Sequence, residues 1–179
     1  MAEETKQTYC AFVANLDKNN IHTVYHDKQY GFTLNDDDEL FGRLILEINQ
    51  AGLSWTTILK KQNNFRKAYS DFKIKKIANY DEKETKRLLN DSSIIRNKLK
   101  VKATIYNAQQ VVLIQKEFGS FKFWLEKNKE KKLEEWIKLF KKIFKFTGQE
   151  ITKEFLISTG IIEGAHAKGC PIFDKIRTL

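Results

Sequence analysis

The chain has 179 residues, a formal net charge of +9 and a pI near 9.4. It holds no apolar run approaching the roughly 18 residues of a membrane span, and the polar start, residues 1–9, has no apolar signal-peptide core. These features argue against a membrane protein and predict an intracellular, cytoplasmic one. The basic excess favours an anionic partner, nucleic acid before a membrane surface, although ordinary lysine-rich solubility is the alternative.

An all-α fold is indicated by the single proline, the eight glycines and the absence of sustained period-2 alternation. No linker and no internal repeat divides the chain. We therefore expect one compact helical domain spanning residues 1–179, with residues 1–9 flexible.

The expected helices follow one another along the chain. Asn35 and the acidic residues after it predict a helix from about Asp36 to Ala51, which Gly52 ends. Ser54 can cap the next helix. Later helices are expected at about 74–79, 81–90, 96–118, 121–125 and 133–144, and a last one ends at about 159. The spacing of a capping box marks the start of two helices, with Asp81 and Glu84 in one and Thr147 and Glu150 in the other.

The connection at residues 91–96 links a short expected helix to a long one with a basic start. This pattern suggests a helix-hairpin-helix, whose backbone N–H groups and helix N-terminus can hold a DNA phosphate. A plain corner between two helices with a solvated lysine face is the alternative.

Glu47 lies in an apolar helical stretch between Leu46 and Ile48. Burying an ionised carboxylate is costly unless a partner compensates it, so Glu47 either faces water or lines a pocket. Aromatic residues that could share such a pocket, or simply pack in the core, are Phe12, Tyr25, Tyr30 and Trp55. Together they would stack a nucleobase while the carboxylate accepts a hydrogen bond from an exocyclic amino group.

The only two cysteines, Cys10 and Cys170, each have a histidine nearby in sequence, His26 and His166. The four have the composition of a tetrahedral zinc site that would tie the two chain ends together. With all four positions filled by protein, the metal would be structural. Two buried thiols with two unrelated histidines are the alternative.

Five segments make the chain similar to the type I DNA-3-methyladenine glycosylases. They are YHDKQYG (25–31), LEINQAGLSWTTILKK (46–61), SIIRNKLKVKATIYNA (93–108), FKFTG (144–148) and HAKGC (166–170). The resemblance implies an all-α fold with a helix-hairpin-helix and one structural Zn²⁺ per chain on Cys10, His26, His166 and Cys170. It also implies a monomeric enzyme of base-excision repair that flips 3-methyladenine out of alkylated double-stranded DNA and releases it hydrolytically, leaving an abasic site.

The resemblance assigns roles to individual residues. It implies that Glu47 is the catalytic residue and reads the base edge, that Tyr25 and Trp55 stack on the base, and that Phe12, Tyr30 and His22 complete the pocket. Leu53 matches a side chain that approaches the gap in the duplex. Expected DNA contacts are Gly52, Leu53, Ser93, Arg96 and Lys98. No catalytic aspartate after the hairpin is implied.

The sequence departs from the family pattern at several places. Phe12 and Tyr30 stand where tryptophan is expected, His22 where tyrosine is common, and Ser93 where glycine is frequent. The segment between Trp124 and Trp136 is also shorter. Two alternatives follow: a non-catalytic helix-hairpin-helix protein that binds damaged DNA, and a zinc-tied basic interaction protein unrelated to repair.

Overall fold

The computed structural model describes residues 8–177, in which the chain is helical throughout and forms no strand. The elements are α1 (Tyr9–Val13), α2 (Ile21–Lys28), α3 (Asp37–Gln50), α4 (Trp55–Ala68), a 3-10 turn (Ser70–Phe72), α5 (Ile74–Ile77), α6 (Glu82–Asn90), α7 (Lys98–Phe118), α8 (Phe121–Lys127), α9 (Leu133–Ile143), α10 (Gln149–Ser158) and α11 (Pro171–Arg177). This compact arrangement confirms the predicted all-α fold. None of the helices in this part of the chain is long and apolar enough to cross a membrane.

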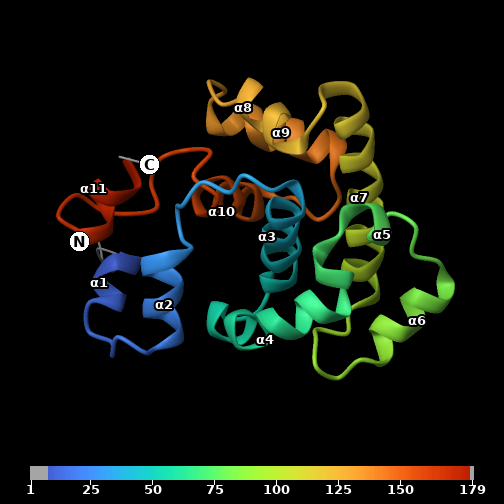
Figure 1. The fold of residues 1–179 in the computed structure, drawn as a ribbon, viewed down its shortest axis with the longest axis horizontal. Coiled ribbons are helices and arrows are strands. Elements are labelled where there is room, and N and C mark those ends of the chain that lie inside the picture. The colour runs from blue at the N-terminus through green and yellow to red at the C-terminus, as the bar shows by residue number, and fades with distance from the viewer. Residues whose placement is uncertain (1–7, 178–179) are drawn as a thin grey trace, which may run out of the picture.

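Helix α3 is the centre of the molecule, with α4, α7, α8 and α10 packed around it (Figure 1). Every residue of α3 from Leu40 to Asn49 is buried. The core around it is largely aromatic and includes fully buried Phe41, Phe65, Phe121, Trp136, Phe140 and Phe155. A polar side chain on α3 is therefore surrounded by protein, whichever way it points.

The acidic first turn of α3 caps three helices. Asp36 accepts a hydrogen bond inside α3 itself, as predicted. Asp37 accepts the N–H groups of Phe121 (2.7 Å) and Lys122 (2.8 Å) at the start of α8. Asp38 accepts the first N–H of α5 at 2.8 Å. These bonds satisfy helix donors that would otherwise lack partners, so the turn fixes the positions of α5 and α8 against α3.

The two ends of the described chain lie together, because α1, α2 and α11 form one end of the molecule (Figure 1). Residues 1–7 of the start that we expected to be flexible lie outside the described residues. Tyr9, the last residue of that start, begins α1, and Thr8 caps the helix. Helix α11 was not foreseen in the tail.

Two helix starts differ from the sequence prediction. The prediction of a capping box at Thr147 and Glu150 is wrong. The Thr147 hydroxyl donates instead to carbonyls at the end of α9, and α10 begins after Gly148 without a side-chain cap. Helix α7 begins at Lys98 because the Asn97 side chain accepts its first N–H groups. The glycine stop of α3 is confirmed, since Gly52 follows the C-cap with φ of +81°.

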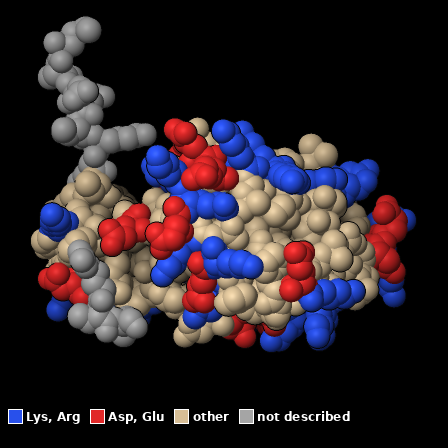
Figure 2. All heavy atoms as spheres, turned by 90° about the horizontal axis from the view of Figure 1, so that it is seen from above, with Lys and Arg blue, Asp and Glu red and all other residues tan. Residues whose placement is uncertain are grey.

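The face of the molecule on which α8 and α9 lie carries side chains of both charges. Figure 2 shows lysine and arginine side chains there interspersed with aspartate and glutamate. The excess positive charge of the chain is thus not gathered into one patch on this face.

Gly42→Ala is expected to lower the free energy of unfolding by about 1–3 kcal/mol, as overpacking of a core does. A Cβ at Gly42 would lie 2.3 Å from the Phe72 ring, which is 1% exposed. Phe72 cannot easily move, since it closes a turn whose three residues all have left-handed φ values. Urea and thermal unfolding would measure the loss. Gly148→Ala is the control, because a Cβ there meets nothing within 4 Å; equal effects would contradict the expectation.

Candidate functional site

A cavity of about 310 Å³ opens between α1, α2, α3, α4 and α10. Its walls combine aromatic and polar side chains, from Tyr9, Tyr25, Tyr30, Glu47, Gln50, Trp55 and Glu154. The Tyr25 ring centre lies 5.3 Å from that of Trp55 and 5.7 Å from that of Tyr30. The cavity thus offers ring faces to a flat ligand and carboxylates to its edge.

Glu47 lines this cavity from the buried face of α3 and is 4% exposed. Its pKa is raised to about 8, chiefly because burial disfavours the ionised carboxylate. Arg43 opposes the shift, Glu154 adds to it, and the hydroxyl of Ser158, which donates to Oε1 of Glu47 at 3.4 Å, opposes it. A positive charge in the cavity would favour the ionised form of this carboxylate.

Arg43 is buried one helical turn before Glu47 and was not singled out from the sequence. Its Nη1 donates to the Tyr25 hydroxyl at 2.8 Å and to the Ser158 carbonyl at 3.2 Å. The guanidinium lies over the Tyr25 ring, 5.0 Å from its centre. Arg43 thus ties α2 and α10 to α3 and fixes the ring of Tyr25. The same sequence feature that drew attention to Glu47 is present at Arg43, since both are charged residues inside an apolar helical stretch.

The proposed pocket residues are brought together only in part. Tyr25, Tyr30, Glu47 and Trp55 line the cavity, whereas Phe12 and His22 do not. His22 pairs instead with the Tyr9 hydroxyl at 3.0 Å and with Thr56 at 2.8 Å. Phe12 is 40% exposed and packs on both Tyr9 and His22. Tyr9, in the start that we expected to be flexible, lines the cavity and contacts both of these side chains.

The turn after α3 is fixed from two sides. Leu53 donates its N–H to the Gln50 carbonyl at 2.7 Å, and the Gln50 side chain donates back to the Leu53 carbonyl at 2.9 Å. From α7, buried Lys100 donates to the carbonyls of Asn49 and Ala51, at 3.0 and 2.7 Å. Leu53 itself is 37% exposed, so it projects from a rigid turn beside the cavity.

The predicted hairpin lies between α6 and α7. The N–H of Ser93 donates to the Asp91 carboxylate at 2.9 Å, and the Ser93 carbonyl accepts from Lys61 at 2.8 Å. Arg96 and Lys98 are exposed at the start of α7. The Ser93 N–H is thus engaged within the protein, while the two basic side chains are free to meet an anion.

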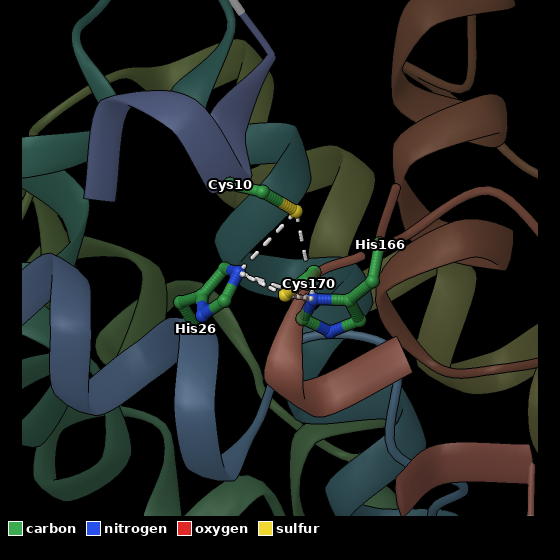
Figure 3. Close-up of side chains that lie close together, drawn as sticks. All are labelled: Cys10, His26, His166 and Cys170. Atoms are coloured by element: carbon green, nitrogen blue, oxygen red, sulfur yellow. Dashed lines mark hydrogen bonds between the residues drawn. The ribbon is translucent and has the colours of Figure 1, made fainter. Parts of the chain in front are cut away.

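Cys10, His26, His166 and Cys170 converge from α1, α2, the loop after α10 and the start of α11 (Figure 3). The two inner histidine nitrogens are 3.1 Å apart, and nitrogen–sulfur distances run from 3.4 to 3.8 Å. A tetrahedral zinc ion with two nitrogen and two sulfur ligands would require about 3.3 Å and about 3.6 Å for these distances. The cluster therefore fits such an ion.

The outer nitrogens of both histidines have partners that orient the rings. His26 Nδ1 bonds Asp27 at 2.7 Å, and His166 Nε2 bonds the Tyr30 carbonyl at 2.8 Å. Each histidine then directs a lone pair at the other's inner nitrogen, an arrangement that an ion between them would stabilise. The contact with Tyr30 also connects the cluster to the wall of the cavity.

Stability should fall as pH rises, because the pKa of Glu47 is about 8 in the folded chain against 4.5 when exposed. The contribution of the Glu47 carboxyl group to the free energy of unfolding is complete below about pH 4.5 and is lost as pH rises through 8. At about 1.4 kcal/mol per pH unit, the difference is at most about 5 kcal/mol. Urea unfolding of the wild type and of Glu47→Gln from pH 5 to 9 measures it. The variant's curve should be flatter; parallel curves would contradict this origin.

Comparison with known proteins places the chain among relatives of one kind. A family model described as methyladenine glycosylase matches residues 15–140. DNA-3-methyladenine glycosylase 1 of Escherichia coli (strain K12) is 30% identical over 169 residues, covering 84% of this chain and 90% of that protein. DNA-3-methyladenine glycosylase of Haemophilus influenzae is also 30% identical, covering 92% and 97%.

Solved structures agree. The 3-methyladenine DNA glycosylase I of Staphylococcus aureus, a structure on 3-methyladenine recognition, superposes with a TM-score of 0.81 at 31% identity, covering 92% of this chain and 96% of that one. A variant of 3-methyladenine DNA glycosylase I in complex with 3-methyladenine gives 0.82 at 30% identity, covering 91% and 96%. Sequence and fold agree over nearly the whole length, and the chain belongs to the methyladenine glycosylase family.

Proposed function

We propose that this chain is a DNA-3-methyladenine glycosylase of base-excision repair. It binds alkylated double-stranded DNA, flips out a 3-methyladenine nucleotide and hydrolyses its N-glycosidic bond, leaving free 3-methyladenine and an abasic site. The observation that carries this proposal is a buried glutamate at the end of an aromatic cavity. Relatives that cover most of the chain carry the same activity in their names. Because DNA is the substrate, the protein acts inside the cell; we expect it to work as a monomer and a single domain.

The chemistry places modest demands on the protein. Methylation at N3 gives the base a positive charge, so the glycosidic bond is already weak. As that bond breaks, its electron pair neutralises the departing base, which therefore needs no acid. Water adds to the sugar carbon and loses a proton to solvent. The rate enhancement then comes mainly from binding the flipped, ionising state better than the stacked one.

Residue roles follow from the cavity. Tyr25 and Trp55 stack on the base, and the carboxylate of Glu47 accepts a hydrogen bond from its amino edge. Phe12 and His22 contribute indirectly, because they pack against Tyr9 and so support the part of the cavity wall that Tyr9 forms. No dedicated acid after the hairpin is invoked: Asn107, on α7, exchanges hydrogen bonds with the backbone of Lys145.

DNA is engaged beside the pocket. Leu53, on the rigid turn that begins with Gly52, approaches the gap left by the flipped nucleotide. Arg96 and Lys98 neutralise phosphates at the start of α7, and the hairpin backbone near Ser93 lies along the strand. The metal on Cys10, His26, His166 and Cys170 is one structural Zn²⁺ per chain; when bound, it holds the chain ends in place and supplies no reactive group.

Release of bases from methylated duplex DNA tests the proposal. Incubation with the purified protein should liberate 3-methyladenine, identified by chromatography, and leave alkali-labile abasic sites. Duplex binding without base release would favour the non-catalytic helix-hairpin-helix protein. Absence of salt-dependent duplex binding would exclude both and leave an interaction protein unrelated to DNA.

A further inference from the structure

Glu154 is a second carboxylate on the wall of the base cavity, contributed by α10. Neither the sequence pattern nor the family resemblance singled it out. Tyr30 lines the same cavity, and its hydroxyl lowers the pKa of Glu154. Tyr30 is itself held by neighbouring rings, at 5.4 Å from Tyr9 and 5.7 Å from Tyr25 between ring centres. Glu154 therefore has a polar neighbour that is held in place, at a position where the family pattern leads us to expect tryptophan.

The two carboxylates of the cavity oppose each other's ionisation. Burial raises the pKa of Glu154; Lys153 counteracts the shift and exposed Glu150 adds to it. Glu154 in turn helps to raise the pKa of Glu47. Two like charges facing one partly apolar cavity are unfavourable unless a positive charge lies between them. In the empty cavity Glu47 therefore keeps its proton near neutral pH, and a cation between the two carboxylates would favour the ionisation of both.

We propose that Glu154 is a specificity-determining residue that makes the pocket select positively charged N-alkylated purines over neutral purines of the same shape. The proposal rests on the function assigned to the pocket above. Glu47 both accepts a hydrogen bond from the amino edge, which charged and neutral purines share, and carries charge, whereas Glu154 contributes its charge alone.

The chemistry of the ligand supports this division. A cationic base lets both carboxylates ionise, and its charge also interacts favourably with the faces of the surrounding rings. A neutral purine can stack and donate its amino hydrogens equally well, but it brings no positive charge that would favour the ionised forms of Glu47 and Glu154. Selection then depends on charge, beyond shape and hydrogen bonding.

Glu154→Gln keeps the size of the side chain while removing the charge. We expect kcat/KM for 3-methyladenine release from methylated duplex DNA to fall about 10-fold, as the loss of one nearby charge would cause. Affinity for a duplex containing 3-methyl-3-deazaadenine, a neutral base with the same methyl and amino groups, should change less than about 2-fold. Tyr30→Phe, which removes only the hydroxyl, should give a smaller loss confined to the cationic substrate.

Glu150→Gln is the matched control, one turn away on α10 and exposed; both measurements should stay at the wild-type level. Equal losses on the cationic and neutral probes would overturn the proposal, because they would indicate a structural role. No loss on either would overturn it as well. Failure of the wild type to release 3-methyladenine is a separate outcome, which would overturn the proposed function itself.

Discussion

Replacing Glu47 by glutamine should lower kcat/KM for 3-methyladenine release from methylated duplex DNA by about 100- to 1000-fold. Glutamine keeps the shape of the side chain and one carbonyl acceptor, but it cannot carry the negative charge that a cationic base meets in a buried cavity. A charged group inside the protein is worth far more than in water, since little solvent screens it. Single-turnover release, with base quantified by chromatography, measures the effect.

The folded state should survive this substitution. Glu47 is buried and its pKa is raised to about 8, so an uncharged amide removes a destabilising ionisation. We therefore expect Glu47→Gln to unfold at a higher temperature than the wild type above pH 8 while losing activity. Glu47→Ala should lose more activity still, because it also lacks an acceptor. Wild-type release by either variant would contradict the role assigned to this carboxylate.

Helix positions could be predicted where the deciding interaction is local. Asp36, Ser54 and Asp81 each accept an N–H of the helix they precede, as their sequence context predicted, but the Glu84 side chain bonds Arg87 instead of completing the predicted capping box with Asp81. Thr147 has the same kind of context, yet its hydroxyl serves the end of α9. The choice between two helix ends depends on how α9 and α10 pack, and one segment of sequence does not contain that information.

The residues of the candidate site also divide into those that the sequence could predict and those that it could not. Glu47 could be predicted because burying a carboxylate among apolar neighbours conflicts with elementary electrostatics, and Arg43 gives the same signal four residues earlier. Tyr9 and Glu154 give none: one follows a polar start, and the other lies in a helix where a solvent-facing glutamate is ordinary. Only the approach of α1 and α10 to α3 brings them to the cavity. Pairing of the chain ends was predictable, because cysteine and histidine are scarce.

Removing the Zn²⁺ that we propose for the cysteine and histidine cluster should loosen one end of the molecule and displace Tyr9, Tyr25 and Tyr30 from the wall of the cavity. Helices α1 and α11 are short, and Cys10, His26, His166 and Cys170 bring them together with α2. The same segments carry Tyr9, Tyr25 and Tyr30. We expect chelation at mild temperature to lower the midpoint of thermal unfolding by about 10 °C or more, given the binding energies of structural zinc sites. Release of 3-methyladenine should fall with it.

Hydrogen exchange would locate the change. Amides in residues 9–28 and 165–177 should lose protection on chelation, while those of α3 and α7 keep it, because the buried aromatic core does not depend on the metal. Cys170→Ser should reproduce the pattern, and elemental analysis of the untreated protein should give one zinc per chain. Since Glu47 and Trp55 lie on α3 and α4, outside the loosened end, activity should return when zinc is restored. A folded, active protein free of metal, or uniform loss of protection across the chain, would show that the cluster does not hold the pocket together.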